Sequence, residues 1–253
     1  MARVARKKSE TGIYHIMLRG IDGRDIFLDT EDKSKFLDKL LTTKKNVNFK
    51  LYGYCLMDNH IHLLMQEAED IGTSIKRITV GYVHWHNNKY GRSGHLFQNR
   101  YLSEPVETER YLLAVLRYIH QNPQKAIIVK QMNDYLWSSY NQYLALYNGQ
   151  AVHIDGALIK AYFKSSNEFI KFMNEHDDQV FLEYKQVKRY TDNMLRTTIE
   201  KEFNVAHISD LSMETRNKKI KEMYERTGAS IRQLGRVLGV GKGVIENALK
   251  QDR

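Results

Sequence analysis

The sequence predicts an α+β fold, in which helices pack against an antiparallel sheet, followed by a smaller all-α unit at the C-terminal end. Within the first 140 residues the expected order is strand, helix, strand hairpin, helix, extended segment and helix. Hydrophobic residues make up 42% of the 253, so the chain can fill a core. We therefore expect three parts: a domain over 1–140, a mostly helical connector over 141–206, and an all-α unit over 207–253.

The individual elements follow from the spacing of apolar residues and turn residues. Strands are predicted in short runs rich in β-branched and aromatic residues, which are 13–18, 51–57 and 60–66. Helices are predicted where apolar residues recur every three or four positions, which is over 32–44, 71–90 and 108–121. We expect the third helix to stop at Pro123, because proline cannot continue it. A short extended segment is expected around Leu96 and Phe97.

The chain is basic, with 39 Lys and Arg against 30 Asp and Glu and a formal net charge of +9. Both ends are positive, whereas the stretch 141–206 is nearly neutral. Two basic ends indicate two parts that face a polyanion such as nucleic acid, and ordinary surface charge for solubility is the alternative.

The sequence also limits the compartment. It has no run of about 18 apolar residues, and its N-terminus lacks the apolar stretch of a signal peptide. Its single cysteine, Cys55, excludes an internal disulfide framework. We expect a cytoplasmic, nucleoid-associated protein.

Two histidines one residue apart lie in the predicted strand 60–66. Because side chains alternate along a strand, His60 and His62 point to the same face. Two imidazoles converging from one strand supply half of a metal site, and two histidines on a polar sheet face are the alternative. The same spacing at His84 and His86 falls in a helix, where side chains two residues apart lie about 200° apart. We assign that second pair to packing or to the surface.

A tyrosine and an asparagine four residues apart share one face of the third predicted helix. The phenol of Tyr118 needs activation to act as a nucleophile, because a free tyrosine has a pKa of about 10. The side-chain oxygen of Asn122 is a neutral hard ligand. The alternative is a tyrosine that anchors the helix and an asparagine that caps its end.

Four segments, in order along the chain, resemble the single-tyrosine HUH transposases, and most closely the REP-associated tyrosine transposase branch. They are Tyr14–Gly20, Tyr54–Met65, Gly94–Tyr101 and Tyr118–Pro123. The resemblance covers roughly residues 8–140. It implies a ferredoxin-like or RRM-like antiparallel sheet with packed helices.

The resemblance also implies a role for individual residues. Tyr118 falls on the family's catalytic tyrosine, and His60 and His62 fall on its metal-binding histidines. Asn122 falls where the family places a third ligand, an amide or a carboxylate. The implied ion is Mg²⁺ or Mn²⁺. Zinc is the competing ion, but only Cys55 could supply sulfur, and the spacing leaves open which sheet face Cys55 occupies.

The implied activity is metal-dependent cleavage and rejoining of single-stranded DNA next to a hairpin, through a 5′-phosphotyrosine intermediate. Basic residues that we expect to contact the DNA are Arg3, Arg6, Lys7 and Lys8 in the N-terminal arm, and Arg19 and Arg100 in the resembling segments. A merely solvated N-terminus is the alternative for the arm.

The C-terminal unit resembles a helix-turn-helix. Ser230 is placed to cap the first of its two helices, and Gly239 permits the turn between them. Lys242, Asn247 and Lys250 are expected on the exposed side of the second helix, where they would contact duplex DNA. A plain packing or dimerisation unit is the alternative.

Two functions therefore compete: a transposase, active or domesticated, and a non-catalytic, sequence-specific DNA-binding regulator built on the same fold. The presence of Tyr118 together with His60, His62 and Asn122 favours the enzyme, because a regulator has no physical need of all four. The sequence leaves open whether one chain completes the site or whether a homodimer exchanges helices.

Overall fold

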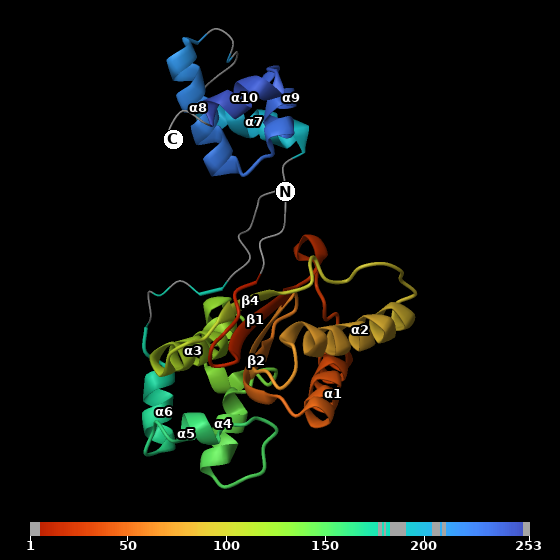
Figure 1. Cartoon of the computed structure of the whole chain (residues 1–253), viewed down its shortest axis with the longest axis vertical. Helices are drawn as coiled ribbons and strands as arrows, with labels where there is room; N and C mark the ends of the chain where they lie inside the picture. Colours follow the sequence, from red (N-terminus) through yellow and green to blue (C-terminus); the bar gives the residue numbers. More distant parts are fainter. Residues whose placement is uncertain are drawn as a thin grey trace. The chain divides into compact units, whose positions relative to one another are not determined.

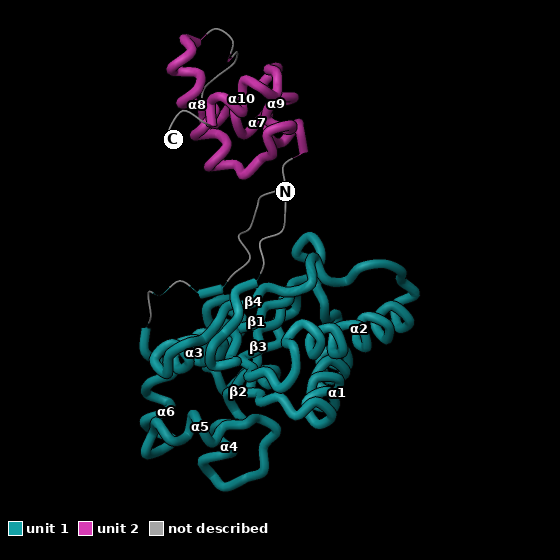
Figure 2. Tube along the Cα trace, viewed as in Figure 1, with its two compact units in different colours: residues 1–183 teal, residues 184–253 magenta. Residues whose placement is uncertain are grey.

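The computed structural model describes residues 6–176, 179, 181–182, 191–203, 208 and 211–249. The chain divides into two compact units, residues 1–183 and 184–253 (Figure 2). The predicted three-part division is therefore corrected, because the expected connector is shared between the two units. Its first half adds Tyr143 and Phe169 to the core of the first unit, whereas Leu195 belongs to the core of the second.

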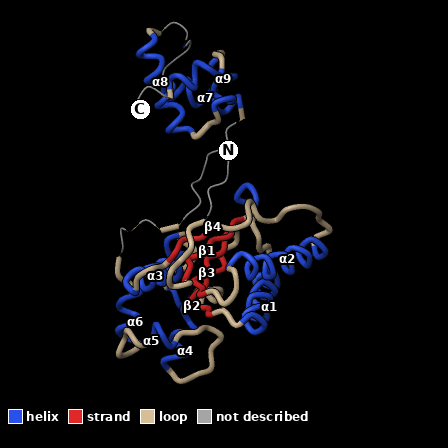
Figure 3. Tube along the Cα trace, in the orientation of Figure 1, coloured by secondary structure: helices blue, strands red, loops and turns tan. Residues whose placement is uncertain are grey.

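A four-stranded antiparallel sheet forms the centre of the first unit (Figure 3). The strand order is β2–β3–β1–β4. The strands are β1 (Ile13–Arg19), β2 (Lys50–Leu56), β3 (His60–Gln66) and β4 (Leu102–Pro105). The α+β fold and the first three predicted strands are thus confirmed.

The fourth strand was not among the predicted elements, since only a short extended segment around Leu96 and Phe97 was expected before the third helix. Phe97 makes only an isolated bridge with Gly20, and the continuous pairing with β1 is made by residues 102–105. β4 is an edge strand, which explains how Pro105 is tolerated there.

Helices cover both faces of the sheet (Figure 1). On one side lie α1 (Thr30–Val47) and α2 (Ile71–Lys89), and on the other lies α3 (Glu109–Lys125). α3 approaches β2 so closely that a Cβ added at Gly53 would lie 2.5 Å from Leu116 Cδ1. β1, β2 and β3 are buried on both faces and so read as continuous apolar runs instead of alternating ones.

Side-chain caps begin the three long helices. Asp29, Asp70 and Thr108 each accept a hydrogen bond from the backbone N–H three residues later. The end of α3 differs from the prediction, since this helix continues through Pro123 to Lys125. A proline lacks the backbone N–H and so removes one helical hydrogen bond. The last turn of α3 tolerates this loss, and the helix ends two residues after Pro123.

Shorter elements complete the first unit. They are the 3-10 helices η1 (Ile21–Gly23) and η2 (Met132–Asp134) and the α-helices α4 (Tyr140–Tyr147), α5 (Ala157–Lys160) and α6 (Ser166–Met173). None of the helices in the described ranges has the length and apolar content needed to span a lipid bilayer.

Helices are the regular secondary structure of the described residues of the second unit. Its helices are α7 (Asp192–Phe203), α8 (Met213–Thr227), α9 (Ile231–Leu238) and α10 (Lys242–Ala248). Ser230 caps α9 as predicted, and Gly239 ends that helix with a φ of +69°. A Cβ at Gly235 would lie 3.0 Å from the Val240 carbonyl oxygen, so glycine lets the turn approach α9.

Candidate active site and metal centre

The residues predicted to carry the chemistry converge on the sheet face covered by α3. His60 and His62 occupy alternate positions of β3, and α3 carries Tyr118 and Asn122 one turn apart. The ring centroids of His62 and Tyr118 lie 5.4 Å apart. His60 Nε2 lies 3.5 Å from Asn122 Oδ1. The structure therefore brings all four side chains together.

His62 is fully buried and contacts a histidine that the sequence analysis did not single out. Its Nδ1 lies 3.0 Å from Nε2 of His15 in β1, whereas its Nε2 is buried without a hydrogen-bond partner. Burial lowers the pKa of His62 well below its usual value, with a smaller effect from the neighbouring imidazoles. Burial also lowers the pKa of His15 to about 3. Both rings are consequently neutral at neutral pH, as a metal-binding imidazole must be.

The third expected ligand is oriented by a backbone contact. Asn122 Nδ2 donates a hydrogen bond of 2.9 Å to the carbonyl of Tyr118, so Asn122 Oδ1 points toward His60. In the described parts of the chain, no group of three or more His, Cys, Asp or Glu side chains is arranged to hold a metal ion. A metal site here therefore depends on the amide oxygen. Two imidazole nitrogens and one hard oxygen fit Mg²⁺ or Mn²⁺, and the unpartnered Nε2 of His62 is the atom that an ion would satisfy.

The structure answers the question about the face of Cys55. Cys55 in β2 is the register partner of His62, so both side chains lie on the same face. Burial raises the pKa of the Cys55 thiol, which keeps it protonated. A protonated thiol is a poor zinc ligand, and this favours an ion bound by nitrogen and oxygen.

Two further residues contact the tyrosine. The ring of Phe181, from the segment after α6, stacks on that of Tyr118 with centroids 4.5 Å apart, and Tyr118 is only 5% exposed. Lys125 Nζ lies 5.1 Å from the Tyr118 ring centroid. Neither residue was predicted from the sequence, because neither belongs to a motif. The tyrosine is thus covered by one aromatic ring and approached by one cation.

Among the basic residues expected to contact DNA, Arg19 lies nearest the histidines. It is the register partner of His60, and its guanidinium lies over Gly23, where an added Cβ would be 3.2 Å from Nη2. Its position places a cation at the end of β1 beside the site.

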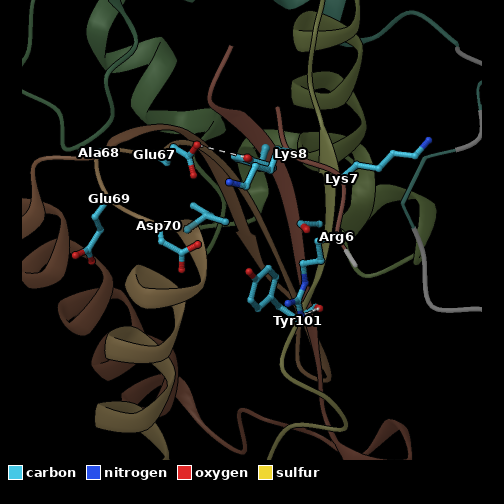
Figure 4. A pocket seen from close by; sticks show the side chains of 11 residues that line it. Arg6, Lys7, Lys8, Glu67, Ala68, Glu69, Asp70 and Tyr101 are labelled. Atoms are coloured by element: carbon cyan, nitrogen blue, oxygen red, sulfur yellow. Dashed lines mark hydrogen bonds between the residues drawn. The ribbon is translucent and has the colours of Figure 1, made fainter. Parts of the chain in front are cut away.

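Arg6, Lys7 and Lys8 lie at the β4 edge of the sheet. Arg6 donates to the Tyr101 carbonyl, and its guanidinium lies 3.8 Å from the centroid of the Tyr101 ring. Around them is a cavity of about 450 Å³, where Lys8 lies on the side of Glu67 (Figure 4). Lys7 also lines this cavity. The same cavity is lined by the carboxylates of Glu67, Glu69 and Asp70, so these three basic residues face acidic residues of their own unit.

A larger groove of about 1140 Å³ runs between α2 and residues 94–101. Its charged lining comprises the cations Arg6, Lys76 and Arg100 and a single carboxylate, Asp70. Arg100 is therefore one of three cations that line this groove.

The predicted DNA contacts of the second unit are on α10. Lys242 and Asn247 are exposed, and Lys242 forms an ion pair of 2.9 Å with Glu246. Arg3 and Lys250 lie outside the described residues.

Comparisons with known proteins find similar sequences among transposases. Residues 8–122 match the protein family described as Transposase IS200 like. Over 155 residues the chain is 24% identical to a Haemophilus influenzae protein named as a REP-associated tyrosine transposase. The aligned region covers 56% of this chain and 87% of that protein.

A solved structure supports the same fold. It is described as a REP-associated tyrosine transposase bound to a REP hairpin. The match covers 60% of this chain and 90% of the chain in that structure, with a TM-score of 0.51 and 18% sequence identity. Residues 8–122 are therefore similar to the IS200-like transposases, and the chain resembles a REP-associated tyrosine transposase in sequence and a second one in fold.

Proposed function

We propose that the first unit cleaves and rejoins single-stranded DNA, with Tyr118 as the nucleophile and with a Mg²⁺ or Mn²⁺ ion bound by His60, His62 and Asn122. The observation that carries the proposal is the meeting of α3 and β3, where the Tyr118 ring lies beside the unpartnered Nε2 of His62. When bound, the ion would withdraw charge from the scissile phosphate.

The reaction exchanges one phosphodiester for another. The Tyr118 oxygen attacks phosphorus and displaces the 3′-oxygen, so that the protein holds a 5′-phosphotyrosine and the DNA keeps a free 3′-hydroxyl. The proton lost by the phenol is balanced by the one gained at the 3′-oxygen. Because the bond energy is conserved in the covalent link, rejoining is the reverse step and needs no ATP.

Hairpin-bearing DNA is the substrate that we propose. The solved relative was captured with a REP hairpin, and the groove lined by Lys76 and Arg100 has the charge and size for unpaired nucleotides. Duplex DNA that flanks the hairpin would be bound by the exposed side chains of Lys242 and Asn247 on α10 and by Lys250. This DNA would belong to the nucleoid.

One observation favours the alternative, a non-catalytic DNA-binding regulator. Phe181 covers Tyr118, so a DNA strand reaches the phenol only after this ring moves. A regulator would bind the same DNA without forming a covalent bond.

A covalent-adduct assay separates the two functions. Labelled hairpin-bearing single-stranded DNA is incubated with the full chain and Mn²⁺, and a protein–DNA adduct that survives denaturation is expected. Tyr118→Phe should form none, and EDTA should abolish the adduct while leaving some DNA binding. Tyr111→Phe is the matched control, since Tyr111 lies on the same helix and also stacks on Phe181. An equal yield from Tyr118→Phe would overturn the assignment.

A further inference from the structure

We propose that Asn59 and His15 are positioning residues that hold Nδ1 of His60 and of His62, so that both rings present Nε2 to the metal ion. The inference rests on the proposed metal site. It concerns two side chains outside the set of ligands, each of which contacts one ligand directly. Such partners commonly fix the ring orientation and the tautomer of a metal-binding histidine.

The contact between Asn59 and His60 has only one assignment of donors and acceptors. Asn59 Nδ2 donates to the carbonyl oxygen of Gly23 at 3.3 Å, which turns Asn59 Oδ1 toward His60. An amide oxygen can only accept, so His60 Nδ1 must carry the proton of the 2.7 Å hydrogen bond between them. In the neutral ring, His60 Nε2 therefore carries a lone pair.

The other side of the His60 ring faces an acceptor as well. Asn122 uses its Nδ2 on the Tyr118 carbonyl, so its Oδ1 faces His60 Nε2 at 3.5 Å. Two lone pairs then face each other without a proton between them, an arrangement that a cation stabilises. The orientation imposed by Asn59 on one side of the ring is thus what makes the other side a metal-binding edge.

His15 acts on His62 across the β1–β3 pair. His62 is opposite Met17, and His15 is opposite Leu64, so the two histidines are diagonal neighbours on the same face. Their rings stack with centroids 5.2 Å apart and Nδ1 of His62 lies 3.0 Å from Nε2 of His15. If an ion were bound at Nε2 of His62, Nδ1 would carry the proton and donate a hydrogen bond to Nε2 of His15.

The burial of His15 supports a role beyond packing. Its side chain is 0% exposed, and its Nδ1 has no hydrogen-bond partner among the described residues. An apolar residue would fill this core position without leaving a buried polar atom unsatisfied. The contact with His62 is the only polar contact that the described structure gives to His15.

The test measures Mn²⁺ affinity of the full chain, from the electron paramagnetic resonance signal of free Mn²⁺. Asn59→Ala and His15→Phe remove the acceptor atoms and should each weaken Mn²⁺ binding by about 10- to 100-fold. Asn59→Asp and His15→Gln keep an acceptor at the same distance along the side chain, and they should stay within a few-fold of the wild type. His86→Phe is the matched control, because His86 is a fully buried histidine of α2 whose ring nitrogens lack hydrogen-bond partners.

A second readout reports the tautomers directly. In the Mg²⁺-saturated wild type, imidazole nitrogen NMR should show Nδ1 protonated in both His60 and His62. Protonation at Nε2 in either ring would overturn the inference for that residue.

The outcomes distinguish the inference from the proposed metal site. If His60→Ala abolishes Mn²⁺ binding while Asn59→Ala and His15→Phe, folded by circular dichroism, bind as tightly as the wild type, the inference fails and the metal site stands. If the wild type itself binds no Mn²⁺, the proposed metal site is wrong, and the inference that rests on it is wrong as well.

Discussion

Four fully buried histidines, His15, His62, His86 and His120, distinguish the core of the first unit at the scale of single residues. Burial lowers the pKa of each of them, so all four are neutral at neutral pH. Two of the four meet at the candidate site. The unpartnered Nε2 of His62 is the atom on which the metal proposal depends most.

Buried histidines also make the fold sensitive to acid, and His120 provides the test. Its pKa is about 3 in the folded protein and about 6.5 in the unfolded chain. Between these values only the unfolded chain holds the proton, so the free energy of unfolding falls with falling pH, by about 1.4 kcal/mol per pH unit. We expect His120→Phe to lower the slope of the free energy of unfolding against pH, measured by urea unfolding, between about pH 4 and pH 6. The decrease should correspond to about one proton fewer taken up on unfolding. An unchanged slope would contradict this account.

Lys125 is expected to assist the nucleophile. Its ammonium lies 5.1 Å from the Tyr118 ring and favours the negative charge that develops on the phenol. Lys125→Gln should slow adduct formation roughly two- to fivefold, which corresponds to about 0.5–1 kcal/mol for an exposed cation. Lys130→Gln makes the same charge change at an exposed position on the segment that follows α3 and should leave the rate unchanged. Equal rates for the two variants would remove Lys125 from the mechanism.

At the scale of elements, α3 unites the site, because it carries both Tyr118 and Asn122 onto the histidines of β3. Its position is set by close packing at Gly53, where a side chain would collide with Leu116. Phe181, which follows α6 in the chain, stacks on the tyrosine. Access to the phenol therefore depends on Phe181 as well as on α3.

Phe181→Ala should expose the tyrosine. Without the stacked ring, the Tyr118 hydroxyl becomes reachable, and the rate of adduct formation should rise several-fold in single-turnover assays. Leu182→Ala is the control from the neighbouring position. A slower Phe181→Ala variant would indicate instead that the ring helps to hold the tyrosine in place.

Local patterns were sufficient to predict much of this first unit. The spacing of apolar residues predicted β1 to β3 and the three long helices, and alternation placed His60 and His62 on one face. The resemblance, not the spacing, supplied the roles of Tyr118 and Asn122.

What the sequence did not predict depends on contacts between distant segments. The partnership of His15 with His62 depends on the register of β1 against β3, which one sequence does not reveal. The same holds for Phe181, which lies 63 positions from Tyr118 in the chain. The predicted end of the third helix at Pro123 was wrong, because a helix tolerates proline in its last turn and the position of that turn was unknown from the sequence.

At the scale of the whole molecule, a single chain supplies both the tyrosine and the histidines. We expect no exchange of helices between two copies. When Tyr118→Phe is mixed with His60→Ala, neither chain should form an adduct, because each lacks one half of its own site. Restored adduct formation in the mixture would show that two copies share a site.

The central claim is that the Tyr118 oxygen becomes joined to the 5′-phosphate of a cleaved DNA strand. Mass spectrometry of the digested adduct tests it most directly. The account predicts the added nucleotide mass on the peptide that carries Tyr118, and only when Mn²⁺ or Mg²⁺ is present. The same mass on any other residue, or cleavage of the strand with no covalent adduct, would contradict it.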